Sequence, residues 1–207
     1  HSFPTRRSSD LQQIVPFVED YRNILILQPA AQSLNKETMA TLQAALKRGI
    51  EMTYQIEESE LVAEALPTQD DRKAIMFYEA AEGGAGVLTR LATEPQALAQ
   101  VAAAALKLLH YNEPDGPWKF DELPALEQVD KNGHHICEAG CYQCLLSYFN
   151  QPDHDNINRR IEDALKLLVA MANAQVVAAP QVTSVLPATL ALSGETPAAN
   201  TADQWLA

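Results

Sequence analysis

The sequence predicts an α/β or α+β domain, in which helices cover a small mixed sheet and a cysteine-rich knuckle closes the fold. Short apolar segments typical of strands alternate along the chain with longer segments that have the 3.6-residue period of helices. All three cysteines of the 207-residue chain lie within eight residues, at Cys137, Cys141 and Cys144. The alternation predicts a sheet packed against helices, and the cysteine cluster predicts a local site that holds a loop together.

The first third of the chain predicts two strands and a helix. Residues 23–28 include an apolar run, Ile-Leu-Ile-Leu, with two β-branched side chains, and they predict a buried strand. A helix is expected next, with Asn35 as its N-cap and Gly49 as its C-terminal stop. Apolar and polar residues then alternate over 50–56, which is the period of a half-buried strand. The acidic segment 57–66 is expected to be a connection.

The middle of the chain predicts a further strand and two helices. Residues 74–79 form an apolar run of strand type, and the helical pattern that follows is divided by Pro95. The glycine-rich turn 83–86 lies between them, and backbone N–H groups at such a turn can bind phosphate. This turn lacks the Gly-Lys-Ser/Thr ending of a P-loop, and Glu82 would repel an anion. We therefore interpret the glycines as allowing close approach of helix and sheet.

The last part of the domain predicts a loop, the knuckle and two helices. Residues 111–133 contain three prolines and predict a polar loop. A short helix is expected at 145–149, and an amphipathic helix at 157–168 with its cap at 155–156. The polar residues within 150–160, which include two arginines, would serve as caps and turns or, alternatively, contact phosphates or a partner.

The cysteine cluster favours one bound zinc ion. Zinc takes Cys and His ligands in a tetrahedron, and Cys141 and Cys144 have the Cys-x-x-Cys spacing of a chelating half-site. A redox dithiol is an alternative, but it would leave Cys137 unused and would require a thioredoxin-like context. Buried structural thiols are a second alternative, although the neighbouring Gly, Glu, Gln and His residues are not typical of a core segment. The sequence therefore predicts a zinc knuckle.

The fourth ligand is predicted to be a histidine. His135 lies two residues before Cys137, a spacing that lets both side chains reach one ion. His134, His110 and His154 are the alternatives. Changing His135 to Ala should then weaken zinc binding more than changing His110 or His154. The predicted set, three cysteines and His135, would form a closed structural site for one Zn²⁺ without a catalytic position.

Charge and composition narrow the class of protein. The chain has 15 Lys and Arg against 27 Asp and Glu, and its formal net charge is −12. Such a charge argues against a free-standing, sequence-independent nucleic-acid binder. An odd number of cysteines excludes a fully paired disulfide framework, and no signal peptide or membrane-spanning apolar run is evident. We expect a cytoplasmic protein with no membrane partner.

Three parts are expected along the chain. Residues 1–11 resemble a translated sequencing-adapter scar and are excluded from the domain. The predicted domain occupies residues 12–174. Residues 175–207 are rich in Ala, Pro and Thr, which is the composition of a linker or tail. The chain is therefore expected to be a fragment of a longer protein.

Three segments give the chain a resemblance to the MrfA-type zinc-binding domain. They are a strand, Gly-Gly-x-Gly turn and helix at 75–88, the cysteine knuckle at 137–145, and the segment 146–154 followed by Arg159. The resemblance covers about residues 14–172.

The resemblance also bears on the fourth ligand. In this family the knuckle commonly opens with Cys-x-Cys-Glu, and His135 stands here in place of the first of those cysteines. Some relatives place another cysteine near the end of the preceding helix, where this chain has His110. The family pattern implies a Cys₃His site and leaves His110 as the alternative to His135.

Domains of this type are found C-terminal to the motor in many bacterial DEAD/DEAH-box superfamily-2 helicases and in a component of the DISARM anti-phage system. The resemblance implies a non-catalytic, zinc-binding accessory domain of an ATP-dependent helicase in DNA repair or phage defence. ATP would bind only in motor domains that lie outside this chain. The implied partners are those motor domains and, through them, nucleic acid, with DNA expected. The alternative is a scaffold domain of a multi-protein anti-phage complex without a motor.

Overall fold

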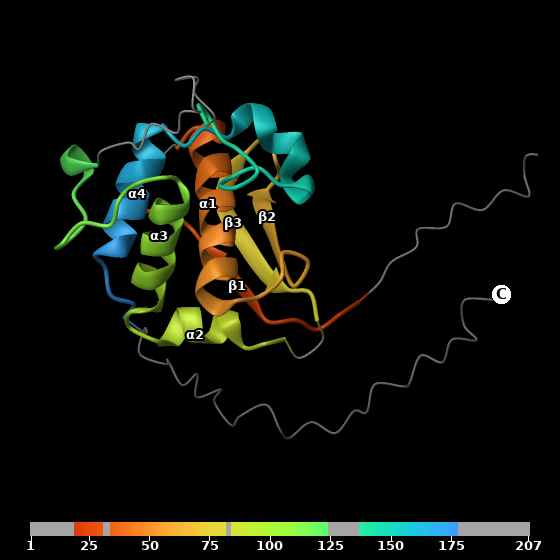
Figure 1. The fold of residues 1–207 in the computed structure, drawn as a ribbon. Helices are drawn as coiled ribbons and strands as arrows, with labels where there is room; N and C mark the ends of the chain where they lie inside the picture. Colours follow the sequence, from red (N-terminus) through yellow and green to blue (C-terminus); the bar gives the residue numbers. More distant parts are fainter. Residues whose placement is uncertain (1–18, 31–33, 82–83, 124–136, 178–207) are drawn as a thin grey trace, which may run out of the picture. The chain divides into compact units, whose positions relative to one another are not determined.

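The computed structural model describes residues 19–30, 34–81, 84–123 and 137–177. The chain divides into a compact unit that ends at Val177 and a second unit, 178–207, which lies outside the described residues. The expected scar at 1–11 also lies outside them. Within the compact unit the predicted α+β class is confirmed, because a small sheet packs against helices (Figure 1).

The sheet has three strands in the order β1-β3-β2, namely β1 (Ile24–Leu27), β2 (Leu61–Pro67) and β3 (Arg72–Glu79). Both pairings are antiparallel, so the sheet is antiparallel rather than mixed. A four-residue turn joins β2 to β3, and so short a connection permits only an antiparallel pair. Phe77 of β3 lies opposite Leu25 on one side and Ala63 on the other, and it is buried.

Two further predictions, for the segments that form β2 and β1, are wrong. The acidic segment expected to be a connection contains β2, which pairs with β3 along its whole length. The strand β1 exists as predicted but is not buried, because Ile24 and Ile26 are 57% and 53% exposed. β1 is an edge strand, and alternate side chains of a strand point to opposite faces of its sheet. The face that carries Ile24 and Ile26 is therefore open, whereas the face that carries Leu25 lies against the core.

The helix α1 (Lys36–Tyr54) is longer than the sequence predicts. Its predicted N-cap is confirmed, since Asn35 Oδ1 accepts a hydrogen bond from Thr38 N at 2.7 Å. The predicted stop at Gly49 and the strand over 50–56 are wrong. Ile50 is buried whereas Met52 is 57% exposed, which is the spacing of a helix and not of a strand.

Gly49 allows two helices to pack closely and does not end α1. A Cβ atom at this position would lie 2.5 Å from the carbonyl oxygen of Val101, which belongs to α3 (Ala97–Leu108). The glycine therefore lets α1 and α3 approach each other more closely than any other residue would allow. This contact is part of the packing that places α1 between the sheet and α3 (Figure 1).

The remaining helices follow the predicted order with shifted bounds. Pro95 separates α2 (Val87–Thr93) from α3, as predicted. The short helix expected at 145–149 is wrong for 145–147, which lie in a turn and an irregular connection, and the 3₁₀ segment η3 (Tyr148–Asn156) begins only at Tyr148. Another such segment, η2 (Phe120–Glu122), lies in the predicted polar loop. The last helix, α4 (Glu162–Ala172), begins later than predicted and packs against α3.

A single apolar core joins these elements. Its buried members come from the four α-helices, from β2 and β3 and from the connecting segments, and two of the cysteines, Cys137 and Cys144, belong to it. Among the described residues, no helix combines the length and apolar character needed to traverse a bilayer.

Candidate metal centre

Four potential metal ligands meet at one point of the structure. They are the imidazole of His110 and the thiols of Cys137, Cys141 and Cys144, whose ligand atoms all lie within 4.8 Å of one another. His110 comes directly after α3, and the cysteines come from the segment before η3. Two segments that are distant in the sequence are thus brought together by the packing of α3 in the core.

The spacing of these atoms fits a tetrahedral zinc site. Ligands at ~2.3 Å for sulfur and ~2.0–2.1 Å for nitrogen stand ~3.8 Å (S···S) and ~3.6 Å (S···N) apart around a tetrahedral ion. Here Cys144 Sγ lies 3.7 Å from Cys137 Sγ and 3.5 Å from Cys141 Sγ. Cys141 Sγ lies 3.6 Å from His110 Nε2. The three thiols are free and form no disulfide.

The backbone of the knuckle holds its sulfur atoms in place. Cys144 N and Leu146 N both donate hydrogen bonds to Cys141 O at 3.0 Å, which closes a tight turn around the Cys-x-x-Cys pair. Within this turn Cys141 N points at Cys144 Sγ at 3.1 Å. N–H groups directed at a sulfur stabilise its thiolate form. The turn is therefore arranged for a charged sulfur.

The three thiols titrate in different directions without a cation. Burial, and then the neighbouring Cys144, raise the pKa of the Cys137 thiol to about 12. Burial also raises the pKa of Cys144. At Cys141 the effect of burial is outweighed by hydrogen bonds, first from Cys144, and the pKa is lowered. Because thiolates this close repel one another, a divalent cation is the partner that lets all three ionise together.

His110 has an unusual backbone conformation. It follows α3 with φ of 66°, in the left-handed region that glycine usually occupies at this position of a helix end. His110 N donates to Lys107 O at 3.0 Å and Tyr111 N donates to Leu106 O at 3.1 Å, the hydrogen-bond pair of a Schellman cap. A histidine in this place costs free energy that glycine would avoid, which indicates that the imidazole has a role.

The imidazole is also in the protonation state that binds metal. Burial, and then the positive charge of Arg159, lower the pKa of His110 below its ordinary value. Neutral imidazole is therefore the dominant form at neutral pH, and only neutral imidazole can coordinate a cation.

The histidines that the sequence offers as ligands differ in where they lie. His135, the predicted fourth ligand, and His134 lie outside the described residues, so the place of His135 in the site stays a prediction. His154 Nε2 lies 3.0 Å from Ser147 O and 3.0 Å from Asn150 Oδ1, so its ring belongs to the local structure of η3. Among the described residues, His110 is the histidine that lies with the three cysteines.

The glycine turn before α2 holds a carboxylate of the protein itself. A Cβ at Gly84 would lie 1.7 Å from Glu79 Oε2, so the glycine makes room for this side chain. Glu79 Oε1 accepts a hydrogen bond from Leu88 N, in the first turn of α2, at 3.2 Å. The place where a phosphate would bind is thus taken by a buried carboxylate. This agrees with the interpretation of the turn as a packing feature.

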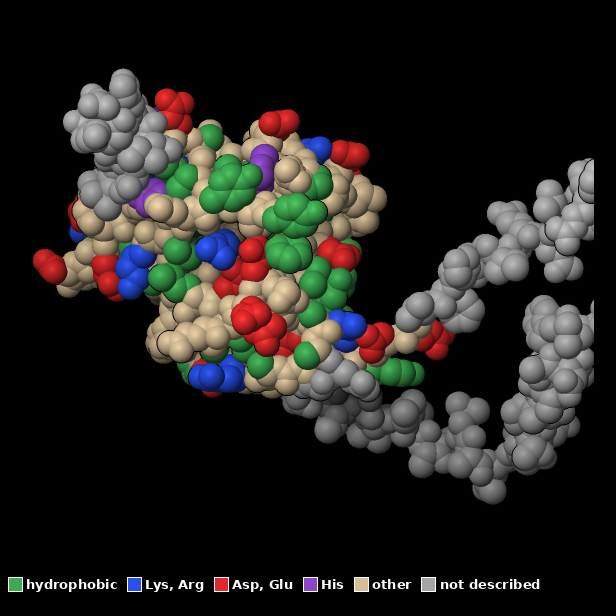
Figure 2. Space-filling view, turned by 45° about the vertical axis from the view of Figure 1, so that its right-hand side comes forward, with side chains coloured by type: hydrophobic (Ala, Val, Ile, Leu, Met, Phe, Trp, Pro, Cys, Tyr) green, Lys and Arg blue, Asp and Glu red, His purple; other side chains and the backbone are tan. Residues whose placement is uncertain are grey.

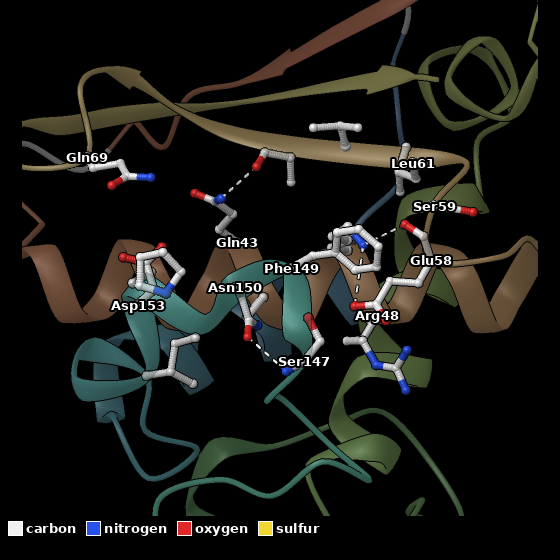
Figure 3. Close-up of a pocket in the computed structure, with 17 residues that line it drawn as sticks. Gln43, Arg48, Glu58, Ser59, Leu61, Gln69, Ser147, Phe149, Asn150 and Asp153 are labelled. Carbon is white, nitrogen blue, oxygen red and sulfur yellow. Dashed lines mark hydrogen bonds and ion pairs between the residues drawn. The ribbon is translucent and has the colours of Figure 1, made fainter. Parts of the chain in front are cut away.

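A cavity of about 180 Å³ lies between α1, β2 and η3 (Figure 3). The amide and ammonium donors that line it bind groups of the protein: Gln43 Nε2 donates to Ala63 O at 2.9 Å, and Lys47 Nζ donates to Glu51 Oε1 at 2.5 Å and to Glu58 O at 3.0 Å. The buried Glu58 Oε1 accepts no hydrogen bond, but it lies 3.8 Å from the same Lys47 Nζ. Since these donors are used within the protein, we assign this cavity no ligand.

Charged side chains on one face of the described domain are mixed in sign (Figure 2). On the face shown in Figure 2, Lys and Arg side chains lie beside Asp and Glu side chains rather than in one basic patch. Arg48, for example, pairs with Glu51 at 2.8 Å, and Arg90 pairs with Glu94 at 2.7 Å. This distribution does not resemble the basic stripe that sequence-independent nucleic-acid binders present.

Comparison with known proteins gives one match. The family model described as MZB, the MrfA Zn-binding domain, matches residues 42–145. The match includes His110 and all three cysteines. No curated protein and no solved structure matches the chain.

Proposed function

The chain belongs to the MrfA Zn-binding domain family, and from this premise we propose that it is a zinc-binding accessory domain of an ATP-dependent DEAD/DEAH-box helicase. The zinc-binding part of this statement follows from the family and from a Cys₃His cluster that fits one zinc ion. The helicase context is supported by the family resemblance of the sequence.

We assign the metal ligands to His110, Cys137, Cys141 and Cys144. This assignment rests on the position of the four ligand atoms, which all lie within 4.8 Å of one another, and on three separations of 3.5–3.7 Å that match the edges of a tetrahedral zinc site. The proposed role of the ion is structural, because four protein ligands leave no open position for water or substrate. When bound, zinc would link the end of α3 to the knuckle before η3.

Metal analysis of the purified chain tests this assignment. The protein should be purified under reducing conditions without chelator, and its zinc content measured by mass spectrometry together with thiol titration. We expect one zinc per chain and thiols that become reactive only after a strong chelator is added. Metal-free protein with a reversible Cys141–Cys144 disulfide would instead support the redox alternative, since these sulfur atoms lie 3.5 Å apart.

The accessory role rests on the chemistry of the surface. A net charge of −12 and paired surface charges favour docking onto other protein domains over direct gripping of a nucleic acid. In the proposed helicase, ATP binding, ATP hydrolysis and contact with DNA would belong to motor domains outside these 207 residues. DNA repair or phage defence would be the setting of such a helicase.

A scaffold domain in a multi-protein anti-phage complex is the second candidate, and the same net negative charge favours it. The full-length open reading frame distinguishes the two candidates. A P-loop and an acidic motor box in frame with this domain would support the helicase. A complete gene without them, whose product copurifies with defence proteins, would support the scaffold.

A further inference from the structure

Arg159 is an arginine buried in the core beside the metal centre. Its side chain is among the largest that are fully buried, with 1% of the residue exposed. Within the part of the chain that the structure describes, no carboxylate lies at ion-pair distance from it. By contrast Arg72, the other buried arginine of the described residues, pairs with Asp153 at 2.5 Å. A buried guanidinium without a carboxylate is costly unless another negative group offsets its charge.

The guanidinium of Arg159 joins the two segments that carry the ligands. Nη1 donates a hydrogen bond to the carbonyl oxygen of Leu109, the residue before His110, at 3.1 Å. Nε and Nη2 donate to the carbonyl oxygen of Cys137 at 3.3 Å and 3.1 Å. One planar fork thus fixes the backbone at the histidine and at the first cysteine simultaneously, which the single ammonium of a lysine cannot do with the same geometry.

The backbone of Arg159 adds two contacts to the same region. Its N–H donates to Ala139 O, inside the knuckle, at 2.7 Å. Its carbonyl oxygen accepts a hydrogen bond from Tyr111 Oη, next to His110 in the sequence, at 3.3 Å. Both the main chain and the side chain of this residue therefore bridge the same two segments.

The proposed zinc site would carry a net charge. A divalent ion with three thiolates and a neutral imidazole carries one net negative charge. Cys137 and Cys144 are buried and the other two ligands are half-buried, and a net charge in such a place is stabilised by a nearby charge of opposite sign. Arg159 is placed to supply it, because its hydrogen bonds end on the backbone of Cys137 and on the residue before His110.

We propose that Arg159 is the positioning residue of the zinc site: it holds the His110 segment against the cysteine knuckle and offsets the negative charge of the Cys₃His centre. This inference rests on the proposed zinc site and adds to it a residue that belongs to the sequence resemblance but lies beyond the match to the family model, which ends at residue 145. Groups that orient metal ligands typically contribute 10–100-fold to metal affinity, about the size of effect expected here.

The test compares zinc affinity and ligand geometry in four versions of the 207-residue chain. They are the wild type, R159Q, R159K and the control R160Q, which removes the same charge from an exposed neighbour. Zinc affinity is measured by competition with a chromophoric chelator, and Co²⁺ substitution reports the coordination geometry by absorption. We expect R159Q to weaken zinc binding by about 10-fold or more, R159K to recover part of the loss, and R160Q to remain unchanged.

The outcomes separate this inference from the assignment of the site. If the wild type binds no zinc, the proposed site itself is wrong. If the wild type binds zinc and R159Q binds it as tightly as R160Q, only the role of Arg159 is overturned. Should R159Q fail to fold, R159K decides, because it retains the charge but not the fork. A wild-type affinity and a wild-type Co²⁺ spectrum in R159K would then reject the positioning role.

Discussion

A histidine in a left-handed helix cap makes opposite contributions to stability and to metal binding. At φ of 66°, His110 strains the backbone in the protein without metal, yet this conformation directs its imidazole at Cys141 Sγ. The sequence names His110 only as an alternative ligand, because nothing in its local spacing relates it to a knuckle so far along the chain. Its place directly after a helix end, where glycine is usual, is the local signal that could have selected it.

Substitution of His110 by glycine should separate the two contributions. The H110G variant should lose more zinc affinity than the ~10–100-fold that an outer group contributes, because a ligand itself is removed. Without metal it should be more stable than the wild type by about 1 kcal/mol, because glycine adopts the left-handed conformation without strain. Urea denaturation of the chelated proteins and zinc competition measure the two effects.

The alanine variant is the matched control for this experiment. H110A removes the same ligand and keeps the strain, so it should lose zinc affinity to a similar degree without gaining stability in the metal-free state. Wild-type zinc affinity in both variants would assign the fourth position elsewhere, with His135 as the first residue to change next.

At the scale of the elements, helix periodicity was easier to predict than the ends of helices or the edge strands of the sheet. The N-cap at Asn35 and the division at Pro95 were predicted because a side-chain acceptor and a missing N–H act locally. The C-terminal turns of α1 could not be predicted in this way. The alternation of apolar and polar residues over 50–56 fits a strand equally well until the packing of Gly49 against α3 is known. The sequence does not predict β2, because three of the four residues before it are glutamates and an edge strand is specified by its partner β3 more than by its own sequence.

The close approach of α1 and α3 at Gly49 can be tested by adding one methyl group. G49A should lower the free energy of unfolding by at least ~1 kcal/mol, because the clash with Val101 O outweighs the better helix propensity of alanine. G116A is the control, since a Cβ at Gly116 meets no atom within 4 Å. Thermal and urea unfolding measure the change. A G49A variant as stable as G116A would contradict the assigned packing.

The buried pair of Arg72 in β3 and Asp153 in η3 fastens η3 to the sheet. The side chains are 1% and 12% exposed, and Nη2 lies 2.5 Å from Oδ1. R72M should lower the free energy of unfolding by about 3 kcal/mol, because it leaves a buried carboxylate unpaired. A double-mutant cycle with D153L should give a coupling energy of ~1–3 kcal/mol.

The exposed pair of Arg90 and Glu94 provides the control for that cycle. Its atoms lie as close, at 2.7 Å, but the side chains are 56% and 47% exposed. Water screens such a pair, so its cycle should show little coupling. Equal coupling in the two pairs would mean that burial does not set the strength of the Arg72–Asp153 contact.

At the scale of the whole molecule, the proposed metal is a cross-link between two regions of a core that also has extensive apolar packing. Buried side chains of α1, β3 and α3 form contacts that involve none of the four ligands. The metal centre lies at one end of this packing, where Cys137 and Cys144 join the core. Loss of the metal should therefore affect the molecule unevenly.

Removal of the metal should loosen the knuckle while the centre of the domain stays folded. Hydrogen exchange after treatment with a chelator should show faster exchange at 137–147 and at the end of α3, and little change at 39–46 of α1 and 74–79 of β3. Re-addition of zinc should restore the slow exchange. Uniform loss of protection would show instead that the ion is needed for the entire fold, as in small zinc fingers.

The order of the ligands along the chain has a consequence for biosynthesis. α1, β3, α3 and His110 all precede the cysteines, and residues 111–136 separate the histidine from the first thiol. A growing polypeptide leaves the ribosome in that order, so the helical scaffold can assemble before any sulfur is exposed to the cell. The ion would then bind only after Cys144 has emerged from the ribosome. Arg159, which bridges the two ligand segments, would emerge last.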